Sequence, residues 1–296
     1  MTKVPSSTYR VQFRPEFGFA EGEKIVDYLD RLGVSTIYSA PMFHATEGSE
    51  HGYDIVDMNE ISPELGGEEG FLRLSDQLQS RKMTWLQDIV PNHRAFDGAN
   101  HLLMDALENG PFSKYYRYFD ILWEHPYESI SGRVLAPFLG DFYGRCLERG
   151  EIKIVYTESG FRAQYYDHSF PIRPDTYGDI LSTGIDRLRK RVGTYNKSLV
   201  KLLGIIRFMN NLEEERNENP EFDPLPGLKG LLWEMYQSDE AIRDHIDSCA
   251  ERLNGTPGEP DSFEELHQIL SRQYFRLAYW KVGTEELNYR RFFSIN

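Results

Sequence analysis

The stretch DIVPNH, residues 88–93, closes an apolar run that begins at Trp85. The run is rich in apolar and β-branched residues, as are strands buried in a parallel sheet. It passes into a turn signal that places Asn92 and His93 a few residues behind the carboxylate of Asp88. The pattern predicts a buried strand whose carboxyl end presents three side chains able to bind a ligand.

Upstream of this stretch, strand and helix patterns alternate. Strands are predicted at 8–13, 34–38 and 84–90, and amphipathic helices at 22–32 and 68–81, with a long loop at 40–65. This alternation predicts parallel strands joined by right-handed crossovers. Two architectures satisfy it, a doubly wound sheet and a (β/α)8 barrel, and the pattern does not choose between them.

The regular alternation ends at His93. Residues 94–127 are mixed and aromatic, residues 130–184 have β-rich patterns, and residues 185–217 have a charged helical pattern. The Pro/Gly-rich stretch 219–230 predicts a connection, and further helices are predicted at about 231–253 and 262–280. We therefore expect three parts, at 1–93, 94–184 and 185–296.

The composition excludes several classes of protein. The chain has 296 residues, a formal net charge of −14 and a pI of about 5.1, which argues against a nucleic-acid or anionic-membrane surface. Two cysteines make no disulfide framework, and no signal-peptide or membrane-spanning stretch occurs, so a cytoplasmic protein is expected. No P-loop, GxGxxG, HExxH, zinc-type spacing or GxSxG motif is present, and nothing points to a cofactor or metal.

Polar side chains cluster where two predicted strands end. Residues 51–54, His-Gly-Tyr-Asp, follow the second strand, and Asp88, Asn92 and His93 follow the third. In parallel α/β folds ligands bind beyond the carboxyl ends of the strands. A Tyr can stack on a sugar ring and a His can donate to a hydroxyl. The alternative is structural, because polar residues at strand ends routinely hold turns, and both interpretations stay open on the pattern alone.

These residues resemble the alpha-amylase family of retaining glycoside hydrolases. The stretch 88–93 is similar to that family's first signature at barrel strand three, and Gly-Tyr-Asp at 52–54 is similar to the element after strand two. Further stretches look like one subgroup of the family, the maltooligosyl trehalose synthases: residues 9–12, 48–54, 63–71, 107–111, 274–281 and 286–293. Arg94 and Ser294 depart from the subgroup pattern, outside the core motif.

The resemblance implies the N-terminal portion of a (β/α)8 barrel, with a β-rich and then helical insertion after strand three. The activity implied is an intramolecular transglycosylation that converts the reducing-end α-1,4 bond of a maltooligosaccharide or α-1,4-glucan into an α,α-1,1 bond. Retaining enzymes of this kind use two carboxyl groups about 5 Å apart. The substrate-binding residues implied are Tyr53, Asp54, His93, His51 and Gln12, and the structural residues at the site are Asp88 and Asn92.

The catalytic carboxylates implied by the resemblance are not found. No Gly-x-Arg-x-Asp motif occurs, so the nucleophile and the acid/base are expected beyond Asn296. We expect a fragment that is inactive alone and that a complementary chain carrying the rest of the barrel could restore. The alternatives are another alpha-amylase-type glycosidase and a non-catalytic glucan-binding module.

Overall fold

The computed structural model describes residues 4–219 and 223–282, and it divides into two compact units. Unit 1 comprises the described residues up to His101, and unit 2 those from Leu102 onward. Each unit is described by itself. Within the described ranges, no helix is both long and apolar enough to cross a membrane.

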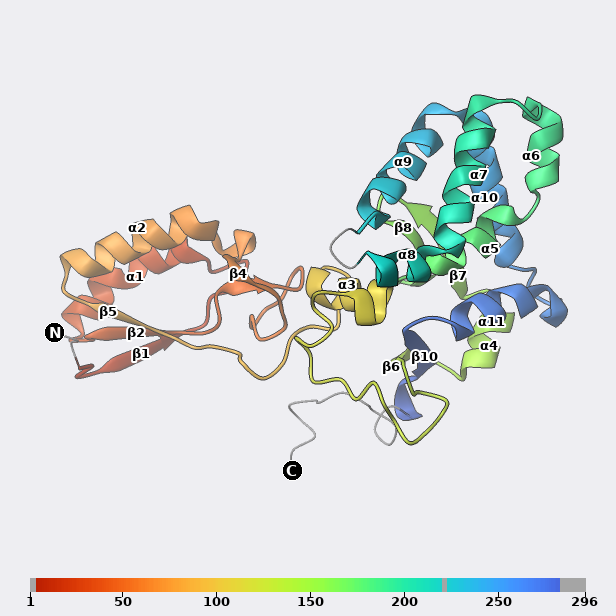
Figure 1. Cartoon of the computed structure of the whole chain (residues 1–296). Helices are drawn as coiled ribbons and strands as arrows, with labels where there is room; N and C mark the ends of the chain where they lie inside the picture. The colour runs from red at the N-terminus through yellow and green to blue at the C-terminus, as the bar shows by residue number, and fades with distance from the viewer. Residues whose placement is uncertain (1–3, 220–222, 283–296) are drawn as a thin grey trace. The chain divides into compact units, whose positions relative to one another are not determined.

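Unit 1 is a small parallel α/β layer. Strands β1 (Thr8–Val11), β2 (Thr36–Ser39) and β5 (Thr84–Gln87) pair in parallel in the order β1-β2-β5. Helices α1 (Phe19–Arg31) and α2 (Gly67–Ser80) pack against each other on one face of this sheet (Figure 1). The predicted strands and both helices are confirmed, although β5 ends at Gln87 and not at Val90.

The core of unit 1 lies between the sheet and the two helices. Apolar residues of α1 and α2 recur at helical spacing, so each helix buries one face. The buried side chains are Val11, Phe13, Phe19, Val26, Leu29, Val34, Ile37, Met42, Leu65, Leu74, Leu78 and Met83. This packing fixes the strands, and thereby the positions of the side chains at their carboxyl ends.

The expectation of a structureless loop at 40–65 is wrong. This segment contains β3 (Phe43–Ala45), β4 (Ile55–Ile61) and the short 3-10 helix η1 (Pro63–Leu65). The β3 and β4 strands pair antiparallel with two register shifts. The irregular pairing explains the missed strands, because shifted registers break the alternation of apolar and polar residues that predicts a strand.

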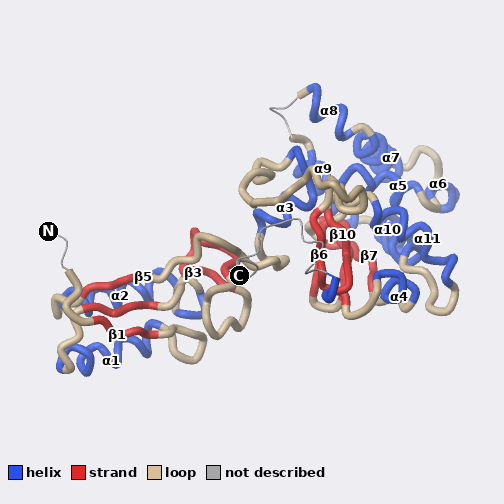
Figure 2. Tube along the Cα trace, turned by 90° about the horizontal axis from the view of Figure 1, so that it is seen from below, coloured by secondary structure: helices blue, strands red, loops and turns tan. Residues whose placement is uncertain are grey.

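Unit 2 contains two small sheets. Strands β7 (Ile152–Thr157), β8 (Gly160–Tyr165) and β9 (His168–Pro171) form an antiparallel meander. Strand β6 (Val134–Leu139) pairs in parallel with β10 (Phe275–Tyr279), and Figure 2 shows these two side by side. The β-rich character expected after residue 130 is therefore confirmed. The helix expected up to residue 280 is wrong in its last part, which is β10.

The remaining elements of unit 2 are helical. The helices are α3 (His101–Asn109), η2 (Gly110–Phe112), α4 (Tyr143–Glu148), η3 (Pro174–Thr176), α5 (Tyr177–Ser182), α6 (Ile185–Val192), α7 (Lys197–Asn210), α8 (Leu212–Glu218), α9 (Leu225–Ser238), α10 (Glu240–Leu253), η4 (Pro260–Phe263), α11 (Glu264–Ser271) and η5 (Trp280–Val282). Helix α10 contacts α5, α6, α9 and β7, so it ties the helices to the meander. The predicted connection at 219–230 is shorter than expected, because α9 begins at Leu225. The boundaries expected at 93 and 184 stay predictions, as does the stretch 286–293, which lies outside the described residues.

Candidate functional site

Side chains from the parallel strands of unit 1 are linked by hydrogen bonds at Asp88. Its N–H donates to the carbonyl of Ser39 over 3.0 Å, which extends the β2–β5 pairing by one residue. The phenol of Tyr53 donates to Asp88 Oδ2 over 2.6 Å, and the phenol of Tyr38 donates to the same oxygen over 3.3 Å. Arg10 Nη2 in turn donates to Tyr53 Oη over 2.9 Å. The result is a hydrogen-bonded chain that uses all three strands.

The register of the sheet explains why these groups meet. Arg10 of β1 lies opposite Tyr38 of β2 in the parallel pairing, so both side chains leave the same face at the same level. The guanidinium of Arg10 is 5.6 Å from the centroid of the Tyr38 ring, within the range of a cation–π contact. Tyr53 and Asp88 were predicted from the sequence as site residues, whereas Arg10 and Tyr38 were not.

Asp88 favours the protonated form of the Tyr53 phenol, and Arg10 opposes this only in part. The hydrogen bond to the Asp88 carboxylate, together with burial, raises the pKa of Tyr53 above its usual value. A phenol that stays protonated donates to Asp88 and keeps a lone pair for the Arg10 N–H. The ring is therefore held at its hydroxyl end by two charged groups, and Tyr53 as a whole is only partly buried.

A glycine positions Tyr53 in its loop. Gly52 has φ of +72°, in the left-handed region that glycine tolerates best. A Cβ at this position would lie 2.6 Å from the carbonyl oxygen of Pro41. The backbone can approach this closely only because residue 52 carries no side chain.

Asp54 is engaged by its own loop. The hydroxyls of Thr46 and Ser49 donate to its two carboxylate oxygens, and the N–H of Thr46 donates to its backbone carbonyl over 3.0 Å. Ser49 Oγ also accepts the N–H of Gly52 over 3.1 Å. These contacts favour a bracing role for Asp54 over direct contact with a ligand.

His51 and Gln12 lie exposed beside this loop. His51 Nδ1 accepts the N–H of Tyr53 over 3.0 Å and lies 3.6 Å from Asp54 Oδ1. With Nδ1 accepting, the neutral ring carries its proton on Nε2, which can donate outward. Gln12 Nε2 donates to the carbonyl of Glu50 over 2.9 Å, so it ties the end of the first strand to the loop.

Asn92 and His93 follow the third strand. Asn92 is exposed and His93 is partly buried. The N–H of Ala95, two residues further on, donates to the carbonyl of Ile55 over 2.9 Å, so this segment runs beside the start of β4. Of the residues selected from the sequence, the structure brings Tyr53 together with Asp88, and His51 together with Tyr53 and Asp54.

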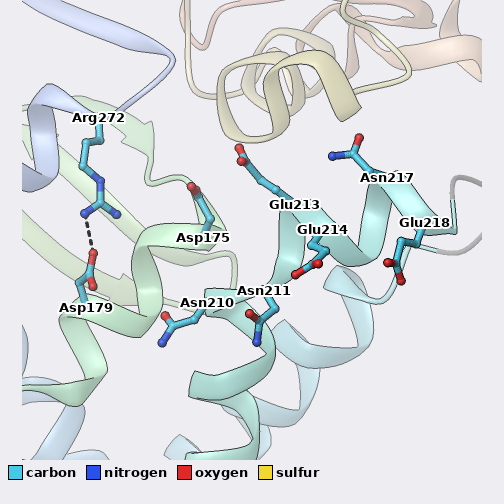
Figure 3. Close-up of a pocket in the computed structure, with 9 residues that line it drawn as sticks. All are labelled: Asp175, Asp179, Asn210, Asn211, Glu213, Glu214, Asn217, Glu218 and Arg272. Carbon is cyan, nitrogen blue, oxygen red and sulfur yellow. Dashed lines mark hydrogen bonds and ion pairs between the residues drawn. The ribbon is translucent and has the colours of Figure 1, made fainter.

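Unit 2 carries a depression of a different character. It has a volume of about 660 Å³ and is lined by Asp175, Asp179, Asn210, Asn211, Glu213, Glu214, Asn217, Glu218 and Arg272 (Figure 3). The lining residue Arg272 pairs with Asp179 over 2.6 Å, and Arg173 pairs with both Asp175 and Glu213. Among the described residues the lining includes no aromatic ring, in contrast to the Asp88 site with Tyr53.

The described residues offer no ready metal site. Across 4–219 and 223–282, no group of three or more His, Cys, Asp and Glu side chains lies close enough together to hold a metal ion.

The Asp88 site combines a fixed aromatic ring with hydrogen-bonding groups. This combination suits a neutral polyhydroxylated ligand.

Comparison with known proteins identifies relatives of both units. The family model described as "Alpha amylase, catalytic domain" matches residues 22–171. A protein of Mycobacterium tuberculosis strain H37Rv named "putative maltooligosyl trehalose synthase" is 45% identical over 141 residues, which are 45% of this chain and 18% of that protein. The intracellular maltogenic amylase of Bacillus subtilis strain 168 is 40% identical over 96 residues, 32% of this chain and 16% of that enzyme.

Solved structures extend the likeness. A maltooligosyltrehalose synthase from Arthrobacter ramosus is 28% identical with a TM-score of 0.60, over 99% of this chain and 26% of that chain. A glycosyltrehalose synthase is 29% identical with a TM-score of 0.61, over 98% of this chain and 28% of that chain. The chain thus spans less than a third of the length of each of these relatives.

Proposed function

The chain belongs to the alpha-amylase family, whose catalytic-domain model matches half of it, and from this premise we propose that it serves maltooligosyl trehalose synthesis. The reaction is an intramolecular glucosyl transfer, an isomerisation that converts the reducing-end α-1,4 bond of a maltooligosaccharide into an α,α-1,1 bond. The parallel strands with α1 and α2 are the corresponding part of a (β/α)8 barrel. Support for the specificity comes from the 45% identity to the mycobacterial protein.

The observation that carries the proposal is the chain of hydrogen bonds from Arg10 through Tyr53 to Asp88. These hydrogen bonds fix the Tyr53 side chain before a sugar binds, so binding costs little further side-chain entropy. We assign the stacking contact with the sugar to Tyr53 and the bonds to its hydroxyls to His93, His51 and Gln12. Asp88 and Asn92 brace the loops, and we assign Asp54 to bracing as well, because hydroxyls of its own loop engage both of its carboxylate oxygens.

The reaction needs the released glucose to stay in place. After the first bond breaks, the glucose turns and is joined again through its anomeric oxygen. Holding it makes the second step effectively unimolecular, so that it outruns attack by water. Residues that bind the sugar without hydrolysing it are therefore central to this activity, and we assign that role to residues of unit 1.

No carboxylate of this chain matches the family's nucleophile or acid/base motif. We therefore assign the holding of the sugar to this chain, and we assign bond breaking to carboxylates on a polypeptide that carries the remaining strands. We place the protein in the cytoplasm, a location supported by its two buried, unpaired cysteines.

The first experiment measures maltohexaose binding by calorimetry. The chain should bind maltohexaose, Tyr53→Ala should abolish binding, and Tyr53→Phe should weaken it, because the ring is kept while its two hydrogen bonds are lost. The matched control is Tyr28→Ala, which removes an exposed tyrosine from α1 of the same unit. Equal binding by all variants would refute the assignment of Tyr53.

The second experiment follows the chemistry. The chain alone should neither remove reducing ends from maltohexaose nor release glucose. Addition of a polypeptide carrying the remaining strands should restore loss of reducing ends without matching glucose release. Matching release would instead favour a hydrolase. If the chain binds maltohexaose but no added polypeptide restores the loss of reducing ends, the result would favour a non-catalytic module.

A further inference from the structure

The guanidinium of Arg10 has more hydrogen-bond donors than its contacts at the Asp88 site use. Its Nη2 donates to Tyr53 Oη over 2.9 Å, and its charged end is 5.6 Å from the centroid of the Tyr38 ring. Within the part of the chain that the structure describes, the Arg10 side chain makes no hydrogen bond or ion pair beyond these two tyrosines, and it is exposed. A guanidinium carries several N–H groups in a planar fork, so donors remain for a ligand.

The sheet fixes the position of this guanidinium. Successive side chains of a strand point to opposite faces, and Val11 packs in the core beneath α1 and α2, so Arg10 projects from the other face. The register places Arg10 beside Tyr38. The guanidinium is thus held by a hydrogen bond to one ring and a cation–π contact with another. A donor fixed in this way loses little side-chain entropy when it binds a ligand.

Arg10 lies at the hydroxyl end of the ring to which we assign the sugar. The hydrogen bond to Tyr53 Oη places the guanidinium next to that end of the phenol. A sugar ring is about as wide as a phenol ring, so a sugar stacked on Tyr53 brings some of its hydroxyls over the same end. A guanidinium can only donate, and the oxygen of a sugar hydroxyl supplies the lone pairs that it needs.

We infer that Arg10 is a further substrate-binding residue, whose guanidinium donates to a hydroxyl of the sugar stacked on Tyr53. The inference rests on the proposed function, because the sugar and its stacking on Tyr53 are taken from there. It gives Arg10 a role beyond fixing Tyr53, since the sugar is bound by N–H groups other than the one that bonds the phenol.

A neutral ligand suits Arg10 better than an anionic one. Asp88 accepts hydrogen bonds from both tyrosines that hold Arg10, so a carboxylate lies across the phenols from the guanidinium. The chain as a whole has a formal net charge of −14. Both the carboxylate and the net charge would repel an anion that approached Arg10. A sugar hydroxyl accepts from the guanidinium without bringing a negative charge near Asp88.

The test is a double-mutant cycle on the whole chain, with maltohexaose binding measured by calorimetry. Arg10→Met should weaken binding about tenfold, as expected when a hydrogen bond from a charged donor is lost. The same substitution in Tyr53→Phe, which lacks the hydroxyl that Arg10 bonds, should again weaken binding about tenfold. If Arg10 acted only through the Tyr53 hydroxyl, its replacement would have no effect in Tyr53→Phe, and the inference would be overturned.

The matched control is Arg73→Met, which removes an arginine with a 58% exposed side chain from α2 and should leave binding unchanged. An equal loss in Arg73→Met would assign the effect to the charge of the chain and overturn the inference. Circular dichroism verifies that each variant stays folded.

A second measurement does not depend on the stability of Arg10→Met. Maltohexaose should shift the guanidinium resonances of Arg10 in the nuclear magnetic resonance spectra of both the unmodified chain and Tyr53→Phe. The resonances are assigned by their absence from Arg10→Lys. Arg10 resonances that maltohexaose leaves unchanged in Tyr53→Phe, while it still binds, would overturn the inference.

Tyr53→Ala separates this inference from the proposed function. If the unmodified chain does not bind maltohexaose, or if Tyr53→Ala binds it equally well, the proposed function fails and the inference fails with it. If Tyr53→Ala abolishes binding but Arg10→Met has no effect in Tyr53→Phe, only the inference fails, and Arg10 is a positioning residue for Tyr53.

Discussion

The two units use the same kinds of charged residue in opposite ways. In unit 1, Arg10 and Asp88 meet at the end of a sheet, where Tyr53 between them is only partly buried. In unit 2, by contrast, a buried arginine ties elements together. Arg216 is 7% exposed and bonds both Asn109 and Asp223. Fixed polar groups with accessible surface are suited to a ligand, whereas buried and fully partnered ones are suited to holding helices together.

The largest effect that this comparison predicts is at the pair of Glu108 and Lys229. Their charged ends are 2.6 Å apart, with side chains 13% and 16% exposed, and they join α3 to α9. Lys229→Ala leaves the carboxylate buried without its partner, so unit 2 should lose about 3–5 kcal/mol of stability. Urea unfolding, with hydrogen exchange measured over each unit, tests this. The control Lys24→Ala breaks an exposed pair on α1 and should have no measurable effect.

The same pair predicts a dependence on pH. Burial raises the pKa of Glu108 above its ordinary 4.5, and Lys229 opposes that rise only in part. The folded chain therefore holds this proton more tightly than the unfolded chain. The contribution of Glu108 to stability is complete below its unfolded pKa and is lost as the pH rises through its folded pKa. The loss in Lys229→Ala should accordingly shrink as the pH is lowered from 7 toward 4.5, and a loss that is independent of pH would contradict buried ionisation.

The second prediction concerns the loop that positions Tyr53. Gly52→Ala places a Cβ 2.6 Å from the Pro41 carbonyl oxygen at φ of +72°, and we expect a loss of about 2–3 kcal/mol together with loss of maltohexaose binding. Gly48→Ala is the matched control, because its φ is +71° and nothing lies within 4 Å of its Cβ. It should cost about 1 kcal/mol from backbone strain alone and keep binding. Equal effects would mean that the close approach to Pro41 does not matter.

The same contrast explains what the sequence could predict. The parallel strands and the two helices of unit 1 have clear periodicity, so their types and order were predictable, whereas β3 and β4 in the long segment 40–65 were missed. Asp88 and Tyr53 were found because each lies in a short motif. Arg10 and Tyr38 were missed because their role depends on the register between β1 and β2, which no local pattern reveals.

In unit 2, the pairing of strands that lie far apart in the chain could not be predicted from local sequence patterns. Strand β10 was mistaken for helix because its partner, β6, lies far earlier in the chain and its register shift removes strict alternation. The contact between the rings of Phe142 and Tyr279 was unpredictable for the same reason, since the two residues lie far apart in the chain. Tertiary contacts override local propensity where a strand is short and its partner is distant.

The smallest predicted effect concerns helix ends. Helices α1 and α2 of unit 1 begin after Gly18 and Gly66, which have no side chain to cap them, whereas α10 of unit 2 begins after Asp239, whose side chain caps it. The Asp239 carboxylate accepts the N–H groups of Ala241 over 3.0 Å and Ile242 over 3.3 Å. Asp239→Ala should therefore destabilise unit 2 by about 1 kcal/mol at neutral pH, and Asp239→Asn, which keeps an accepting oxygen, by much less.

The pH dependence of this cap has the opposite sign to that of Glu108. A hydrogen bond from Ser198, and then the backbone N–H groups of α10, lower the pKa of Asp239 below its ordinary 3.8. Its contribution is complete above 3.8 and disappears as the pH falls through the lowered folded value. Unfolding of Asp239→Ala and of the unmodified chain should thus converge in acid, while Lys229→Ala recovers over the higher range between pH 7 and 4.5. If both variants recovered over the same range, one of the two carboxylates would not ionise as its surroundings require, and the contrast between a buried tie and a partly buried helix cap would fail.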